Sequence, residues 1–168
     1  MFKKVPLSVG ATVRIVASPA LVYAIIADYE DGHPKILPRQ FSDLRVEKGG
    51  KGAGTVIHYQ LKMFGRSRFC RAIITEPDPG RVLVERNVLG SDAVTTFTVD
   101  PGPTGQTDVT ISTVVQIYAG PIGDLQKFLV NWLLKPLYVK ELLKLSSVAT
   151  RRSGPTSASR SSHRQSNP

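Results

Sequence analysis

The sequence predicts one soluble α+β domain in which a curved antiparallel β-sheet wraps around a long C-terminal helix. Three observations predict this class. Segments with strand-like alternation follow one another at hairpin spacing. Two short helical segments come directly after the first strand. The longest segment with helical periodicity, residues 122–149, comes last. The 168 residues are enough for a single domain with a core of ordinary size.

The N-terminal elements have the clearest boundary residues. Residues 12–16 alternate between polar and apolar side chains, which predicts a strand. Ser18 and Pro19 then offer an N-cap and a proline at the first helical position. The apolar residues within 20–29 are spaced for one helical face, and a second short helix is expected at 34–37.

The remaining strands are predicted between clusters of glycine, proline and aspartate. They cover residues 44–47, 55–62, 66–76, 81–88, 94–99 and 107–118. Regular spacing and short turns favour a meander of antiparallel strands. The glycine-rich stretch 49–54 matches neither a phosphate loop nor a dinucleotide-binding motif, so it is interpreted as a hairpin loop.

The C-terminal helix is expected to cover the apolar face of the sheet. Pro136 lies well inside this helix and should kink it. Phe128 and Trp132, one turn apart, belong to its wide apolar face, whereas Tyr138 is placed on another face. A strongly curved sheet need not fill the space beneath such a helix, and gaps of this kind bind apolar ligands. The ligand-binding hypothesis therefore requires an unfilled interior and inward-facing Phe128 and Trp132.

Charge and composition limit the classes of partner. The net charge is +9, but residues 151–168 carry four arginines and no acid, which leaves +5 for residues 1–150. Residues 151–168 hold no large apolar side chain and are predicted to form a disordered basic tail. This balance predicts no stable nucleic-acid partner. Transient contact of the tail with a membrane surface stays open, and the oligomeric state is not predicted.

Targeting and metal signals are missing from the sequence. Pro6 and Gly10 interrupt the segment that follows Lys3 and Lys4, and no apolar run has the length of a membrane span, so we expect a cytoplasmic protein. Cys70 is the only cysteine and is interpreted as a buried, unreactive thiol. The histidines show no metal-ligand spacing, so neither a metal nor a cofactor is expected; they are His33, His58 and His163.

Four segments together resemble a known superfamily. They are residues 17–29, 54–55, 75–81 and 120–123, within a region of resemblance over about residues 10–149. The chain resembles the SRPBCC superfamily, whose helix-grip fold is shared by START lipid-transfer domains, birch-pollen-type allergens and polyketide cyclases. Within it, the chain is similar to the polyketide cyclase/dehydrase and lipid-transport group, and Leu37-Pro38 also resembles the coenzyme Q-binding branch. The resemblance implies a START-like domain over residues 1–150 with a hydrophobic ligand pocket.

Candidate site residues follow from the expected cavity. The residues expected to line it and to contact a ligand are Ile57, Tyr59, Phe69, Phe97, Ile111, Phe128 and Trp132. No catalytic triad or nucleophile motif is present, so no catalytic residue is assigned. Arg71 and Tyr59 are the candidates for steering enolate chemistry, in the manner that the resemblance to cyclases implies. His33, which follows Asp28, Glu30 and Asp31, could present an acid–base or cation site, although acids at a helix end give the same pattern.

Three functions therefore stay open. The first is the binding or transport of a lipid, isoprenoid quinone or polyketide-like molecule. The second is a cyclase/dehydrase-type enzyme that uses the same cavity, and whether the protein is an enzyme is not decided. The third is an RNA- or membrane-interacting module that uses the basic tail. Buried ionisable side chains in contact within the cavity would favour the second function, and a uniformly apolar cavity would favour the first.

Overall fold

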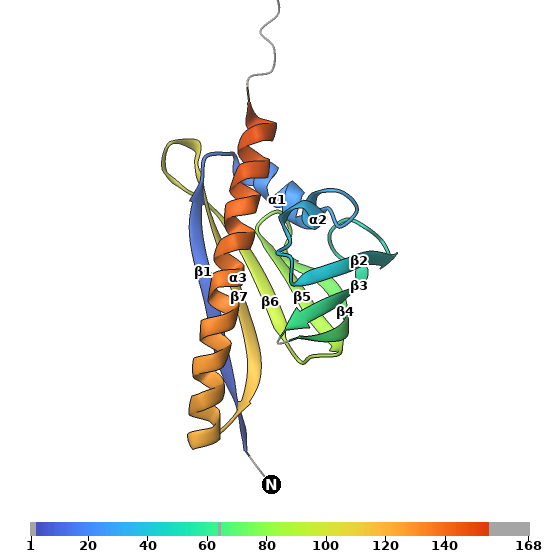
Figure 1. Cartoon of the computed structure of the whole chain (residues 1–168). Helices are drawn as coiled ribbons and strands as arrows, with labels where there is room; N and C mark the ends of the chain where they lie inside the picture. The colour runs from blue at the N-terminus through green and yellow to red at the C-terminus, as the bar shows by residue number, and fades with distance from the viewer. Residues whose placement is uncertain (1–2, 64, 155–168) are drawn as a thin grey trace, which may run out of the picture.

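A computed structural model describes residues 3–63 and 65–154 as one antiparallel sheet, three α-helices and a short 3₁₀ turn. The seven strands are arranged in the order β1-β7-β6-β5-β4-β3-β2. In chain order the elements are β1 (Lys4–Ile15), α1 (Pro19–Ala27), α2 (Gly32–Ile36), β2 (Phe41–Lys48), β3 (Val56–Met63), β4 (Arg66–Asp78), β5 (Val82–Leu89), β6 (Val94–Pro101), η1 (Pro103–Gly105), β7 (Thr107–Tyr118) and α3 (Pro121–Ser153). The curved sheet holds α3 against its concave face (Figure 1), which confirms the predicted fold class.

Strand β1 is longer than predicted. It begins at Lys4 instead of residue 12 and pairs with β7 along its whole length. Pro6 lies inside this strand, which is possible because β1 is an edge strand, where a residue without an N–H group is tolerated. Gly10 is required by a close approach, because a Cβ atom there would lie 2.7 Å from the carbonyl oxygen of Ile111.

Helices α1 and α2 close one end of the sheet. The Ser18 hydroxyl accepts a hydrogen bond from the Leu21 N–H at 3.4 Å, and Pro19 occupies the first turn, as predicted. Val22, Ile25 and Ile26 of α1 are fully buried. Both short helices pack against α3 (Figure 1).

Helix α3 has two unequal halves, separated by Pro136. After Pro136 the helix is anchored in the core by buried residues, which are Leu137, Tyr138, Glu141, Leu142, Leu145, Val148 and Ala149. Before Pro136, only Gly123 is buried. Proline has no N–H group, so the carbonyl of Trp132 lacks its usual helical donor at this boundary. Burial of Tyr138 contradicts its predicted place on a separate, polar face.

The C-terminal boundary differs slightly from the prediction. Helix α3 continues to Ser153, so its last turn includes Arg151 and Arg152, which were expected in the tail. The remainder of the predicted tail, from residue 155 onward, lies outside the described residues. Within residues 3–63 and 65–154, no helix combines the length and the hydropathy needed to cross a bilayer.

Candidate functional site

The sheet and α3 enclose a cavity of about 680 Å³. Its walls come from strands β2 to β7, from α2 and the segment after it, from the turn between β5 and β6, and from the inner side of α3 as far as Glu141. The apolar wall residues include Leu37, Phe41, Leu61, Val115, Leu129 and Leu133. The expected unfilled interior is therefore present.

Only part of the predicted lining faces this cavity. Ile57, Tyr59 and Phe97 line it. Ile111 is fully buried in the core but does not border the cavity. The placement of the other three residues is wrong, because they point outward with 42% (Phe69), 64% (Phe128) and 62% (Trp132) of their surface exposed.

The residues on α3 and the residue on β4 were misplaced for different reasons. On the first half of α3, the cavity is lined by residues 126, 129, 130, 133 and 134, so the inner face includes the positions that directly follow Phe128 and Trp132. Both sides of this helical half are apolar, and the periodicity alone could not select the correct side. On β4, strand alternation turns Cys70 inward and Phe69 outward, where its ring lies 5.4 Å from that of His58. Cys70 is buried as interpreted, and burial raises the pKa of its thiol.

Arg71 does not face the cavity either. Its guanidinium donates two hydrogen bonds, of 2.8 and 2.9 Å, to the carboxylate of Glu47 on the outer surface. This bidentate contact satisfies the arginine away from the cavity, so the structure does not place Arg71 where its predicted role would act. The arginines that border the cavity are Arg66 and Arg68, both exposed, and Arg68 donates to the carbonyl oxygen of Gly90 at 3.0 Å.

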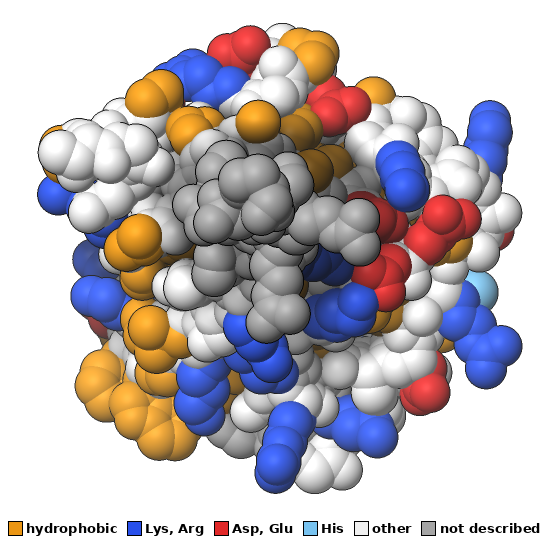
Figure 2. All heavy atoms as spheres, turned by 90° about the horizontal axis from the view of Figure 1, so that it is seen from above, with side chains coloured by type: hydrophobic (Ala, Val, Ile, Leu, Met, Phe, Trp, Pro, Cys, Tyr) orange, Lys and Arg blue, Asp and Glu red, His pale blue; other side chains and the backbone are white. Residues whose placement is uncertain are grey.

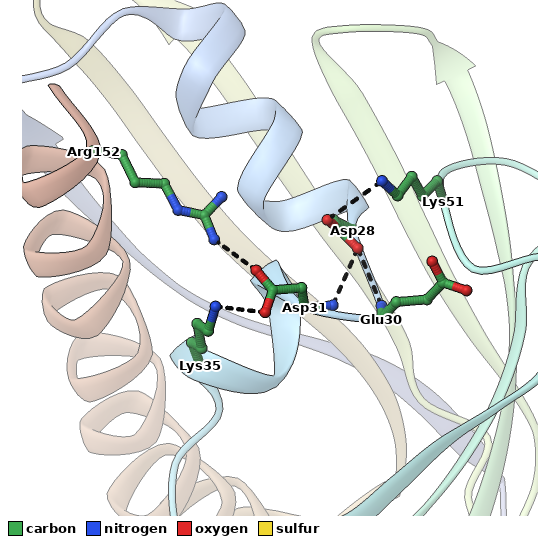
Figure 3. Close-up of polar contacts among 6 residues, drawn as sticks. All are labelled: Asp28, Glu30, Asp31, Lys35, Lys51 and Arg152. Atoms are coloured by element: carbon green, nitrogen blue, oxygen red, sulfur yellow. Dashed lines mark hydrogen bonds and ion pairs between the residues drawn. The ribbon is translucent and has the colours of Figure 1, made fainter. Parts of the chain in front are cut away.

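The acidic segment before α2 is structural (Figure 3). Asp31 binds Lys35 at 2.5 Å and Arg152, in the last turn of α3, at 3.0 Å. Asp28 accepts the backbone N–H groups of residues 30 and 31 and pairs with Lys51 at 3.7 Å. The Lys35 ammonium beside Asp31 lowers the pKa of that carboxyl. The cation-site hypothesis is not supported, since within the described part of the chain no group of His, Cys, Asp or Glu side chains could hold a metal ion.

His33 belongs instead to a buried polar cluster at the cavity. Its ring is 2% exposed, and its Nδ1 atom lies 2.7 Å from the carbonyl oxygen of Ile26. A carbonyl only accepts, so Nδ1 carries a proton. Its Nε2 atom lies 3.5 Å from a carboxylate oxygen of Glu85, which also accepts a 2.5 Å hydrogen bond from the Tyr29 hydroxyl.

Glu141 is the second acid of this cluster. It borders the cavity, is 4% exposed, and makes no hydrogen bond to any residue that the structure describes. Burial, and next the charge of Glu85, raise the pKa of Glu141 well above its ordinary value, with Lys144 acting weakly in the opposite direction. The site therefore favours the neutral form of this carboxyl group, which offers both a donor and an acceptor to the cavity.

Two buried tyrosines extend the polar surface. Tyr59 donates to the Asn87 side chain at 3.0 Å, and Tyr138 donates to the Thr113 hydroxyl at 2.5 Å. Burial raises the pKa of both phenols, so both keep their protons at neutral pH. Of the two candidates for steering enolate chemistry, Tyr59 lines the cavity and Arg71 does not; His33, the acid–base candidate, also borders the cavity.

Glu85 and Glu141 were not among the predicted site residues, although the sequence carries a signal for each. Leu83, Glu85 and Asn87 alternate along β5, and Leu83 is fully buried, so Glu85 must share the inner face. Glu141 lies four positions from Leu137 and from Leu145, both buried, on one face of α3. An acid in phase with apolar residues is the pattern that indicates a buried ionisable group.

We expect the first half of α3 to open more readily than the second. Residues 121–135 lie on the cavity and bury almost no side chain, whereas residues 137–149 are held by the core. Hydrogen–deuterium exchange measured by mass spectrometry should give amides 122–135 at least about tenfold less protection than amides 138–149. Equal protection across Pro136 would contradict this division of the helix.

Comparisons with known proteins agree with this geometry. Residues 6–150 match the sequence model of a family described as polyketide cyclase/dehydrase and lipid transport. The solution structure of the KanY protein is 31% identical, covers 86% of this chain and 97% of its own, and superposes with a TM-score of 0.75. The comparison with curated sequences gave no match.

More distant structures share the fold. The Zhui aromatase/cyclase from Streptomyces sp. R1128 is 18% identical over 92% of this chain and 99% of its own, with a TM-score of 0.73. A START superfamily protein from Mycobacterium smegmatis is 16% identical over 86% of this chain and 98% of its own, with a TM-score of 0.67.

Proposed function

Because the chain belongs to the polyketide cyclase/dehydrase and lipid transport family, we propose that it binds a mainly apolar small molecule whose oxygen-bearing end lies against Glu85 and Glu141. The observation that carries the proposal is the cavity of about 680 Å³ with apolar walls and one buried acidic end. Its volume is in the range of sites that enclose a small molecule.

The two parts of the cavity would contribute differently to binding. Each square ångström of apolar ligand surface that leaves water contributes about 25 cal/mol, which makes the walls the main source of affinity. The neutral Glu141 carboxyl can donate to a ligand carbonyl or accept from a ligand hydroxyl. A buried polar group without a partner is unfavourable, so a ligand with a matching oxygen is preferred over a pure hydrocarbon. This chemistry favours a polyketide-like, phenolic or quinone ligand.

We expect the protein to bind 2-naphthol more tightly than naphthalene, by about three- to tenfold, since the two probes differ by one hydroxyl group. Isothermal titration calorimetry measures both affinities. The variant Glu141→Leu should bind the two probes equally well, and Phe128→Ala, at an exposed position, should behave like the wild type. Equal affinities in the wild-type protein, or binding of neither probe, would contradict the proposal.

Acid–base catalysis is a second candidate function, favoured by the contact between His33 and Glu85 beside the neutral Glu141. In this function the His33–Glu85 pair removes a proton from the carbon next to a ligand carbonyl, while Glu141 donates a hydrogen bond to the carbonyl oxygen. This is the proton transfer that a cyclase/dehydrase-type reaction needs. The criterion derived from the sequence, buried ionisable groups in contact at the cavity, favours this function over a purely passive carrier.

The two functions can be separated with 1-tetralone in deuterated buffer. An enzyme of this kind accelerates deuterium incorporation next to the carbonyl, as followed by NMR, and Glu85→Gln removes the acceleration without removing binding. A passive carrier binds 1-tetralone and leaves its exchange rate at the value in buffer.

A further inference from the structure

The outer face of α3 carries an uncovered apolar stripe, formed by Ile122, Leu125, Phe128, Trp132, Val139 and Leu143. We propose that this stripe docks the protein onto an anionic lipid surface. Five of these side chains have more than half of their surface exposed: Phe128 64%, Trp132 62%, Leu125 61%, Ile122 58% and Leu143 54%. Large apolar side chains that gather on one surface indicate an interaction site, whereas single exposed ones do not.

The stripe has the geometry of a helix that lies in a membrane interface. Its members follow one another three, four or seven positions apart, so they share one side of α3 over about 30 Å. The opposite side of α3 packs against β1, β7 and the short helices. In Figure 1 no other element lies in front of α3, and the outer side of the helix is free along its length.

Charge favours a lipid surface over a second copy of the chain. Lys135 and Lys140 lie beside the stripe and are exposed, while Asp124 is the one exposed acid among residues 121–144. Lysines that flank an apolar face can bind anionic headgroups while their alkyl chains lie along the acyl region. Two copies that met through this stripe would bring these lysines together. In Figure 2, hydrophobic side chains gather along the lower left edge of the molecule with Lys and Arg side chains beside them.

Docking would also orient the cavity. Leu129 and Leu133 lie on the first half of α3 and line the cavity from within, so one layer of helix separates the stripe from the interior. The membrane proposal concerns the outer face alone, however, and it holds whether or not the cavity contains a ligand. Its failure would therefore leave the proposed function intact.

The protein contains its own reporter for this contact, because Trp132 is the only tryptophan and lies within the stripe. The full chain is titrated with vesicles of phosphatidylcholine alone and with vesicles of phosphatidylcholine and phosphatidylglycerol in equal amounts. We expect a blue shift of the Trp132 emission with the anionic vesicles, a weaker one with phosphatidylcholine alone, and a decrease of binding at high salt.

Matched double variants test which surface is responsible. L125S/F128S removes apolar surface from the stripe and should weaken partitioning into anionic vesicles by at least about tenfold. V88S/L89S changes two exposed apolar residues on β5 and should bind like the wild type. K135E/K140E should remove the preference for anionic over neutral vesicles.

Three results would overturn the proposal. The first is an emission spectrum that does not respond to vesicles. The second is vesicle binding that L125S/F128S leaves unchanged, since binding would then come from another surface, such as the basic tail. The third is a concentration-dependent dimer in which Trp132 is shielded from acrylamide without lipid, which would assign the stripe to a second copy.

Discussion

Replacement of Phe97 by alanine is expected to lower the free energy of unfolding by about 3–5 kcal/mol. Phe97 is 2% exposed and lies in the centre of the sheet, paired with Leu83 on β5 and Ile111 on β7. Its ring packs edge-on against His33 with centroids 5.7 Å apart. Truncation removes buried apolar surface and enlarges a cavity that the fold must already maintain, so little relaxation can compensate.

The matched control is Phe128→Ala, which should change the free energy of unfolding by no more than about 0.5 kcal/mol. The two substitutions remove the same atoms, and only the environment differs, since Phe128 is 64% exposed. Urea denaturation followed by circular dichroism measures both. A large loss for Phe128→Ala together with a small loss for Phe97→Ala would mean that α3 faces the sheet with its other side.

Glu141→Gln is expected to stabilise the protein above neutral pH. Burial and the charge of Glu85 raise the pKa of Glu141 in the folded state, whereas unfolding exposes the carboxyl to water and returns the pKa to its ordinary value. Between these two pKa values the folded state binds a proton that the unfolded state releases. The stability contributed by the proton is complete at acid pH and is lost as pH rises, by up to about 1.4 kcal/mol per pH unit. Glutamine is neutral at every pH and avoids this loss.

The measurement is urea denaturation of both proteins at about pH 5 and about pH 8. We expect E141Q to exceed the wild type at the higher pH and the difference to shrink at the lower pH. Glu47→Gln is the control, because the pKa of the exposed Glu47 is lowered by Arg71 and its carboxyl stays charged throughout this range. A Glu141→Gln variant that is less stable at both pH values would show that a charged, partnered carboxylate is required there.

Local sequence rules were sufficient for most of the fold. The Ser18-Pro19 signal located the start of α1, and the alternation within 107–118 predicted β7 with the bounds that the structure shows. These predictions succeeded because period and capping are properties of neighbouring residues. Strand β1 was partly missed, because the tolerance for Pro6 depends on its place at the sheet edge, which is a property of the whole fold.

The site was less predictable because it depends on side-chain direction. Ile57, Tyr59 and Phe97 could be placed from strand alternation, which offers only two faces. The inner face of α3 could not be placed in this way. Phe128 and Leu129 are both apolar, and only the tertiary structure decides that Leu129 lines the cavity while Phe128 faces outward. Glu85 and Glu141 were overlooked because acidic side chains are usually exposed to water. Their position inside the protein is indicated only by their spacing from buried leucines on the same strand or helix face.

The division of α3 at Pro136 has a consequence for how this protein can change. The residues that shape the roof of the cavity, Val130, Leu133 and Leu134 among them, belong to the half of the helix that contributes least to the core. Substitutions there alter the shape of the interior at little thermodynamic cost, while Leu142 and Leu145 continue to secure the fold. Apart from Tyr138 and Glu141, the shape of the cavity roof and the stability of the fold thus depend on separate parts of one helix, and a lineage can diversify the first while it preserves the second.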